Sequence, residues 1–146
     1  GVRFSSLPGM LKELPRQFDP ATHRTIELID VLWMKKNSIV AAFEIESTTS
    51  IYSGLLRMSD LAAMQPNLSI KLFLVAPEER RRKVFQEINR PTFSRFTPTI
   101  AEMCWYLSFE KLRHIVSLAE PLIRHLRPDF LDDAAEFCGI NDEDQN

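Results

Sequence analysis

Cysteine, glycine and histidine are all scarce in this 146-residue chain, and each scarcity excludes a class of site. The two cysteines, Cys104 and Cys138, are too few for a disulfide framework and too isolated for a zinc site. Only four glycines are present and none forms a Gly-rich phosphate loop, which argues against P-loop NTPases and dinucleotide-binding enzymes. The three histidines lie far apart without metal-ligand spacing, and no serine nucleophile elbow is found.

Long hydrophobic runs are also missing. No apolar run approaches the ~18 residues needed to cross a bilayer, and no signal peptide is visible. Hydrophobic residues make up 45% of the chain and charged residues 26%, which excludes a disordered or collagen-like chain. We therefore expect one globular domain in the reducing cytoplasm, with no membrane partner. The chain begins at Gly1 rather than Met, which is compatible with a piece of a longer protein or with a tag remnant.

The formal net charge of −2 combines two unlike parts. Residues 128–146 hold seven acids and no lysine or arginine, so residues 1–127 hold 18 bases against 13 acids, a net charge of +5. A mildly basic body with an acidic end is compatible with nucleic-acid binding, although many unrelated proteins share this distribution.

Apolar patterning predicts an α/β domain that contains a β-hairpin. Residues 26–33 form a β-prone run, residues 35–38 a polar turn, and residues 39–46 the returning strand. Both strands are apolar on both faces, which indicates central strands covered by helices. A helix at 51–65, a strand at 70–75 and a helix from 77 to about 90 follow, and this crossover favours a parallel pairing for the last strand.

The two ends of the chain are predicted in less detail. Residues 1–23 are a lead-in compatible with the end of a truncated helix, because three prolines leave room only for short helices. Residues 103–107 fit a strand or the first turn of a helix, and Ser108 is expected to cap a helix over 109–119. Residues 121–126 and 130–137 are predicted as further helix. The resulting organisation is the lead-in, a core at 24–127 and an acidic segment at 128–146, disordered from 141 onward.

Three acids, Asp30, Glu44 and Glu46, lie in strands that are otherwise apolar. An unpaired buried carboxylate is costly, so central strands rarely carry three of them without a reason. Strand alternation places Glu44 and Glu46 on one face, together with Val40 and Ala42. If Asp30 joins them, the cluster offers hard oxygen ligands suited to Mg²⁺ or Mn²⁺.

The geometry of the hairpin decides whether Asp30 joins the two glutamates. A two-residue loop at 37–38 pairs Asp30 with Ile45 and sends the acids to opposite faces. A three-residue loop at 36–38 places Asp30 directly opposite Glu44. A β-bulge could have the same effect.

These residues resemble the core of the PD-(D/E)XK nucleases, a superfamily of many restriction endonucleases, Holliday-junction resolvases and repair nucleases. The resemblance rests on Ile29-Asp30, thirteen intervening residues, and then Glu44-Ile45-Glu46 at the end of an apolar strand. It covers about residues 24–88. It implies a restriction-endonuclease-like mixed sheet with a central hairpin, then helix, strand and helix, flanked by helices and followed by a helical C-terminal extension.

The resemblance also implies roles for the acids. Asp30 and Glu44 would be the metal ligands, and Ile29 stands where the signature has a proline. Glu46 stands where the family usually has a lysine that orients the attacking water. Some active restriction enzymes of the superfamily carry Glu-x-Glu there, so Glu46 would bind a second metal or act as a general base. The candidate catalytic residues are therefore Asp30, Glu44 and Glu46.

Four cations are candidates for contacting the scissile phosphate. Lys35 and Lys36 lie at the hairpin tip, Lys71 on the next strand and Arg57 on the intervening helix. We expect only Lys71 and Arg57 near the acids. The basic run at 80–83 is interpreted as a solvated helix face rather than as a DNA-binding patch, because four consecutive helical residues point around the whole circumference.

The sequence thus predicts a Mg²⁺- or Mn²⁺-dependent DNA endonuclease of restriction, repair or anti-phage type. Carboxylate-held Mg²⁺ lowers the pKa of a bound water and neutralises phosphate oxygens, as phosphodiester hydrolysis requires. The alternative is a catalytically degenerate nuclease fold that binds nucleic acid or a protein partner. Further domains of a longer chain are an expected partner, and a homo-oligomer is left open.

Overall fold

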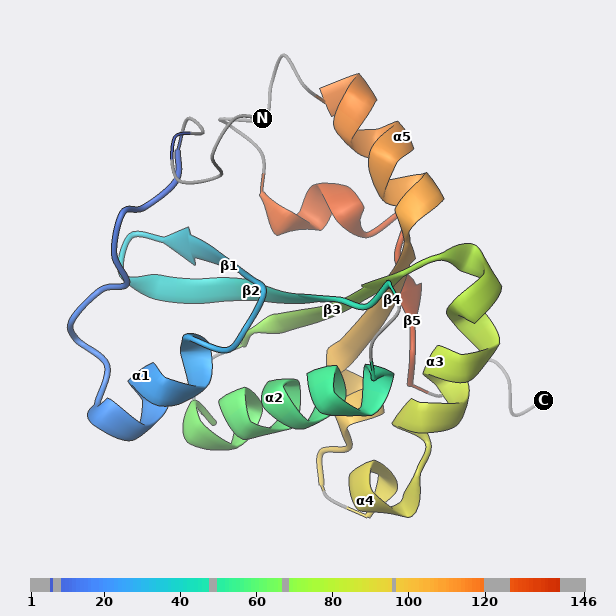
Figure 1. Cartoon of the computed structure of the whole chain (residues 1–146), viewed down its shortest axis with the longest axis horizontal. Helices are drawn as coiled ribbons and strands as arrows, with labels where there is room; N and C mark the ends of the chain where they lie inside the picture. The colour runs from blue at the N-terminus through green and yellow to red at the C-terminus, as the bar shows by residue number, and fades with distance from the viewer. Residues whose placement is uncertain are drawn as a thin grey trace.

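The computed structural model describes residues 6, 9–47, 50–66, 69–95, 97–119 and 127–139, which fold around a five-stranded mixed sheet (Figure 1). The strands lie in chain order and are β1 (Val31–Lys35), β2 (Ser38–Ile45), β3 (Lys71–Ala76), β4 (Cys104–Ser108) and β5 (Glu136–Phe137). β2, β3 and β4 run parallel, whereas β1 and β5 are antiparallel to their neighbours. The predicted α/β class and the parallel pairing of the third strand are confirmed. β1 is an edge strand, so the prediction that both hairpin strands are central was wrong for β1.

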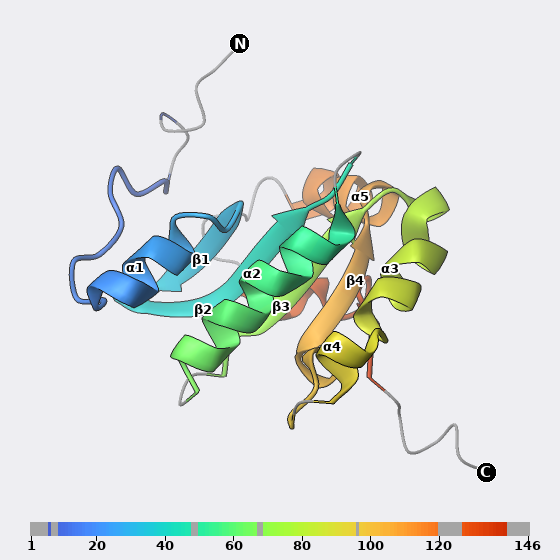
Figure 2. The same cartoon turned by 60° about the horizontal axis from the view of Figure 1, so that its bottom comes forward.

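Helices cover both faces of this sheet. They are α1 (Pro20–Ile26), α2 (Ile51–Met64), α3 (Arg81–Ile88), α4 (Pro91–Ser94) and α5 (Phe109–Ala119), with 3-10 turns at Glu78–Arg80, Ile100–Met103 and Pro128–Leu131. α1 to α4 lie on one side and α5 with the Pro128–Leu131 turn lies on the other (Figure 1). The second view shows α1, α2 and α3 side by side (Figure 2). Because α2 follows β2 directly, its first turns lie over the end of that strand.

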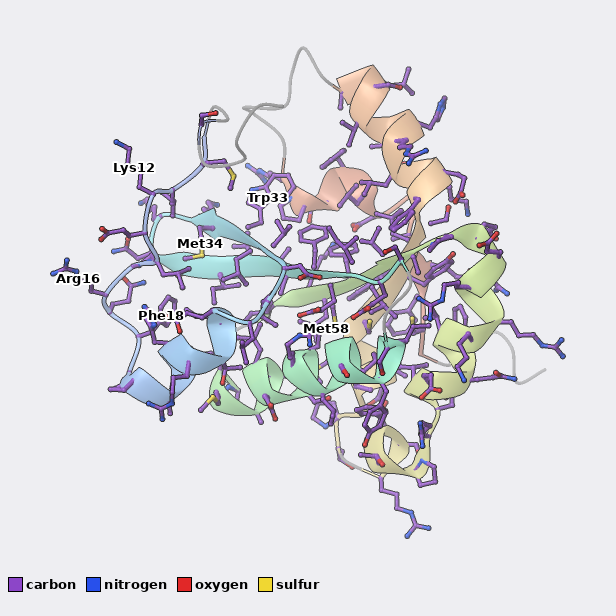
Figure 3. All side chains as sticks on the ribbon, in the orientation of Figure 1. Lys12, Arg16, Phe18, Trp33, Met34 and Met58 are labelled. Atoms are coloured by element: carbon purple, nitrogen blue, oxygen red, sulfur yellow. The ribbon has the colours of Figure 1, made fainter. Side chains whose placement is uncertain are left out.

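Each face of the sheet has its own apolar core. Leu55, Met58 and Leu61 of α2 are fully buried against the sheet, where burial stabilises the fold by roughly 1.5–3 kcal/mol per large side chain. On the opposite face the Phe43 and Phe73 rings stack with centroids 4.9 Å apart. Figure 3 shows Met58 between α2 and the sheet and Trp33 on the opposite side of the sheet.

The hairpin between β1 and β2 combines a two-residue turn with a β-bulge. Lys35 pairs with Ser38 and Met34 with Ile39, but Trp33 pairs with Ala41, so Val40 is the extra residue. The bulge shifts the register by one for the rest of the ladder. Of the three geometries left open by the sequence, the bulge is the one that the protein adopts.

The first helix was not predicted from the sequence. Residues 26–33 were expected to form the first strand, but α1 extends to Ile26 and β1 begins only at Val31. The cause is a strong helix start: Asp19 Oδ1 accepts hydrogen bonds from the backbone N–H groups of Ala21 and Thr22, and Pro20 is the first helical residue. These local signals outweigh the β-branched residues that follow.

The middle of the chain agrees closely with its pattern. The helix predicted at 51–65 is α2, capped by Ser50, and the strand predicted at 70–75 is β3. The helix expected from residue 77 begins as the Glu78–Arg80 3-10 turn and continues as α3. Residues 103–107, for which two interpretations were open, form strand β4, and Ser108 Oγ caps α5 by accepting from the backbone N–H of Lys111 at 3.2 Å.

The C-terminal part departs from its prediction. A helix was expected at 130–137, but the chain forms a 3-10 turn at Pro128–Leu131 and then β5, because Trp105 and Tyr106 of β4 pair with this segment. Leu131 is 1% exposed, so residues 127–139 belong to the packed body. The helix expected at 121–126 and the disorder expected from 141 lie outside the described residues. In the part of the chain that the structure describes, no helix is long and apolar enough to cross a membrane.

Candidate functional site

Carboxylates gather at the carboxyl end of β2, on the face covered by α2. The shifted register places Asp30, one residue before β1, across from Glu44. Asp30 Oδ2 accepts a hydrogen bond from the backbone N–H of Ile45 at 2.8 Å, which holds this exposed side chain against β2. Glu44 and Glu46 are 0% and 2% exposed. The structure therefore places Asp30 across from Glu44, as the bulged alternative required.

Arg57 of α2 binds the buried glutamates from the helix side. Its Nε lies 3.0 Å from Glu44 Oε1 and its Nη2 lies 2.6 Å from Glu44 Oε2, a bidentate ion pair. The same Nη2 lies 3.5 Å from Glu46 Oε1. The Arg57 side chain is 29% exposed, so it connects the buried acids with the surface. Both oxygens of Glu44 are thus engaged by one guanidinium.

Burial and neighbouring charges act on Glu44 in opposite directions. Desolvation raises the pKa of Glu44, and its hydrogen bonds and Coulomb attraction to Arg57 lower it. The negative charges of Asp30 and Glu46 raise the pKa further, and its net direction is upward. Glu44 in turn raises the pKa of Arg57, which stays a cation. Asp30 and Glu46 therefore both act on the charge of Glu44.

Gly54 makes room for the acids beneath α2. A Cβ atom on Gly54 would lie 2.6 Å from Glu46 Oε1 and 3.3 Å from Glu44 Cβ. Glycine inside a helix costs about 0.5–1 kcal/mol relative to alanine, so the sequence accepts a weaker helix at this point. The scarcity of glycine could have pointed to Gly54, but its role depends on the approach of α2 to β2.

The contact between Arg80 and Glu46 was not predicted from the sequence. Arg80 Nη1 donates to the backbone carbonyl oxygen of Glu46 at 3.1 Å. Residues 81–83 are exposed, as expected for a solvated face, and within it Arg81 pairs with Glu136 and Lys83 with Glu87. The sequence does not show which of the four basic residues reaches Glu46, because this depends on the 3-10 turn after β3.

Of the two cations expected near the acids, the structure does not bring Lys71 to them. Lys71 aligns with Ala41, on the opposite face of the sheet, where its Nζ lies 2.7 Å from Asp132 Oδ1 and 5.6 Å from the Trp105 ring centroid. Lys35 and Lys36 lie at the hairpin tip, at the other end of β2 from Glu44. Of the four predicted cations, Arg57 is the one that contacts the acids.

A family model for the C-terminal domain of the type II restriction enzyme NmeDI matches residues 3–138. The chain belongs to this family. The type II restriction enzyme NmeDI of Neisseria meningitidis serogroup C is 27% identical over 143 residues, which cover 93% of this chain and 40% of that protein. The chain thus spans less than half the length of the curated relative that it matches. No solved structure matches it.

The carboxylate oxygens of this NmeDI-family domain are suitable ligands for a divalent cation, although Arg57 already occupies both oxygens of Glu44. Carboxylate oxygens are the ligands that Mg²⁺ and Mn²⁺ prefer. Among the described residues, however, no three His, Cys, Asp or Glu side chains are arranged to hold a metal ion. The guanidinium of Arg57 stands as the cation on Glu44 instead, with both carboxylate oxygens engaged.

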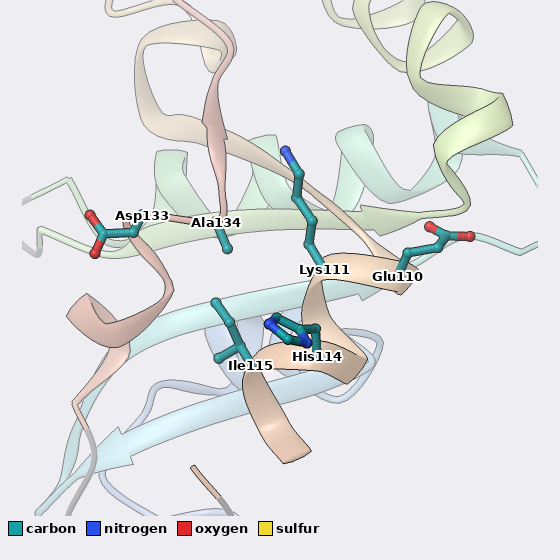
Figure 4. A pocket seen from close by; sticks show the side chains of 6 residues that line it. All are labelled: Glu110, Lys111, His114, Ile115, Asp133 and Ala134. Atoms are coloured by element: carbon teal, nitrogen blue, oxygen red, sulfur yellow. The ribbon is translucent and has the colours of Figure 1, made fainter. Parts of the chain in front are cut away.

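Two surface depressions of this NmeDI-family domain lie away from the acids. A depression of about 490 Å³ between α5 and the segment before β5 is lined by Glu110, Lys111, His114, Ile115, Asp133 and Ala134 (Figure 4). It lies on the face opposite to α2. A groove of about 560 Å³ lies along the carboxyl-terminal half of α2 and includes Asp60, Ile70 and Phe93 in its wall. Neither is lined by Asp30, Glu44 or Glu46.

Proposed function

We propose that this chain is the metal-dependent nuclease domain of a restriction-type enzyme and that it hydrolyses DNA phosphodiester bonds. The observation that carries the proposal is the meeting of Asp30, Glu44 and Glu46 at one end of β2, in a member of a restriction enzyme family. Hydrolysis of a phosphodiester needs an activated water and neutralisation of phosphate charge. A cluster of oxygen ligands in a sheet-and-helix frame supplies both through a divalent cation.

In this proposal the site is a Glu-x-Glu variant of the PD-(D/E)XK arrangement. Asp30 and Glu44 would hold Mg²⁺ or Mn²⁺, which lowers the pKa of a bound water and stabilises charge on the phosphate. Glu46, in place of the usual lysine, would accept a proton from the attacking water. The β1–β2 bulge and the Asp30 hydrogen bond to Ile45 support this assignment, because both hold the acids of two strands together.

The cations near the acids and at the hairpin tip would support different parts of a DNA contact. Arg57 and Arg80 both adjoin the acids, and either guanidinium could bind a phosphate bidentately. Lys35 and Lys36 are exposed at the hairpin tip, where they would contact a DNA backbone farther from the acids. Target selection would come from further domains of a longer chain, since the relative is much longer, or from a second copy.

The alternative function is a nuclease-like domain that binds DNA or a protein without cleaving. The observation in its favour is the bidentate Arg57–Glu44 pair, which occupies both oxygens of a proposed metal ligand. A degenerate site of this kind would keep its ion pair permanently and take up no metal.

A cleavage assay separates the two functions. Plasmid, single-stranded DNA and RNA are incubated with the protein in Mg²⁺, in Mn²⁺ or in EDTA, and the variant Glu44→Gln is compared with wild type. We expect cleavage of DNA by wild type with either metal, and a loss of about 10²-fold or more in the variant. Asp60→Asn, an exposed acid of α2, is the matched control. Equal cleavage by wild type and Glu44→Gln would refute the proposed site.

A further inference from the structure

We propose that Arg57 is an internal cation that competes with the metal ion for Glu44, so that the metal binds only when the guanidinium is displaced. The inference rests on the proposed function. It adds a gating residue to the site. Metal binding then also requires the free energy needed to displace Arg57 from Glu44. Arg57 is a positioning residue in this account, because it acts through Glu44.

Arg57 and a metal ion would occupy the same space beside the oxygens of Glu44. A metal ion coordinates a carboxylate oxygen directly, at about 2.0–2.6 Å for Mg²⁺ or Ca²⁺. Glu44 is 0% exposed, and its two oxygens lie 3.0 and 2.6 Å from Arg57 Nε and Nη2. A cation that reaches either oxygen therefore enters the space that the guanidinium fills.

The charges around Glu44 both attract and repel a divalent cation. Asp30 lies across from Glu44, and Arg57 contacts both Glu44 and Glu46. Three carboxylates with the Arg57 guanidinium sum to a formal charge of −2, and Arg80 beside the Glu46 carbonyl oxygen brings the local sum to −1, which still attracts a divalent cation. With Arg57 still in place, however, the guanidinium would repel that cation at close range. Attraction by the cluster and repulsion by Arg57 therefore oppose each other.

The exposure of Arg57 supplies a path for the exchange. Its side chain is 29% exposed whereas both glutamates are buried, so the arginine can swing toward solvent while the acids stay in place. The acids lie close beneath α2 at Gly54, where even an added Cβ atom would be 2.6 Å from Glu46 Oε1, so there is little free space between them and the helix. Displacement of Arg57, rather than movement of Glu44, is the opening that the packing allows.

Binding of Mn²⁺ to the whole protein tests this gate without any cleavage. The free Mn²⁺ concentration is followed by electron paramagnetic resonance for wild type, Glu44→Gln, Arg57→Lys, Arg57→Ala and the double variant Arg57→Lys with Glu44→Gln. Losing the bidentate pair removes charge-assisted hydrogen bonds, so both single Arg57 variants should bind Mn²⁺ at least about tenfold more tightly than wild type. The double variant should lose this gain. Arg82→Ala, an exposed arginine of α3, controls for loss of positive charge and should stay within about twofold of wild type.

The outcomes separate this inference from the proposed function. Equal Mn²⁺ affinity for wild type and Arg57→Lys, lost in each on Glu44→Gln, would overturn the gate and leave the metal site standing. Absence of Mn²⁺ binding from every variant would overturn both. Circular dichroism shows whether each variant is folded, and Arg57→Lys, which keeps a cation beside Glu44, carries the test if Arg57→Ala does not fold.

Discussion

Asp30 Oδ2 accepts a hydrogen bond from the backbone N–H of Ile45 at 2.8 Å, and this contact ties the turn before β1 to the last residue of β2. We expect Asp30→Ala to lower the free energy of unfolding by about 1 kcal/mol, because the amide of Ile45 loses its partner. Asp30→Asn keeps an acceptor oxygen and should cost less than half of that. Urea unfolding measures both, and equal destabilisation by the two variants would contradict the role of this hydrogen bond.

The Arg57–Glu44 pair should respond unequally to loss of its two members. Arg57→Ala leaves a carboxylate that is 0% exposed without its partner, so we expect a loss of about 3 kcal/mol in unfolding free energy. Glu44→Ala leaves an arginine that is 29% exposed and can reach water, so we expect about half of that loss. Urea unfolding of both single variants and of the double variant gives the coupling energy. Additive effects of the two substitutions would contradict the ion pair.

Gly54→Ala should disturb the site more than the fold. The new Cβ would lie 2.6 Å from Glu46 Oε1, which forces that carboxylate to move, while alanine improves the helix by about 1 kcal/mol. We expect the midpoint of thermal unfolding to change little and metal-dependent cleavage to fall at least about tenfold. Ser53→Ala, at the neighbouring exposed position of α2, is the control and should cleave as wild type does. Unchanged cleavage by Gly54→Ala would show that Glu46 is not needed in its place.

Lys71→Ala should leave cleavage unchanged. Lys71 lies on the face opposite to the acids and pairs with Asp129 and Asp132, at 3.3 and 2.7 Å. A partly exposed pair of this kind contributes about 0.2–1 kcal/mol to stability, and salt should weaken it. Thermal unfolding at low and high salt measures that contribution. A large loss of cleavage in Lys71→Ala would mean that DNA approaches from the other face.

Tyr106 should make the fold sensitive to alkaline pH. Burial raises the pKa of Tyr106 to about 12, and its hydroxyl donates to the carbonyl oxygens of Ala76 and Pro77, at 3.3 and 3.2 Å. The phenol of the unfolded chain ionises near pH ~10, so the folded state keeps its proton longer and stability falls between about pH 10 and 12.

The loss across that window should approach about 2 kcal/mol, and Tyr106→Phe should abolish the dependence. Tyrosinate absorbance of wild type, which has two tyrosines, should show one group titrating late. Coincident titration of both tyrosines in the folded protein would contradict the burial argument.

Local sequence signals, such as helix caps and apolar runs, predicted most of the helices and strands that depend on them. Ser50 and Ser108 cap the helices that they were expected to cap or precede, and the apolar runs at β2 and β3 became parallel strands. α1 was not predicted, although Asp19-Pro20 is a strong start signal, because the apolar run that follows favours a strand. β5 has two residues and exists only because β4 offers a free edge, which no local pattern reveals.

The candidate site shows the same division between local and tertiary information. Strand alternation was enough to place Glu44 and Glu46 on one face, but the bulge at Val40 that aligns Asp30 depends on how the turn packs. The sequence offered Arg57 and Lys71 as equal candidates, because their distance from the acids is set by helix docking and sheet register. Arg80 and Gly54 reach the acids through tertiary contacts alone.

Anomalous diffraction from a crystal of the protein grown with Mn²⁺ tests the central claim most directly. We expect an anomalous peak within about 2.5 Å of carboxylate oxygens of both Asp30 and Glu44, with the Arg57 guanidinium moved away from Glu44. An intact Arg57–Glu44 pair in that crystal, with no Mn²⁺ beside Asp30 and Glu44, would contradict it.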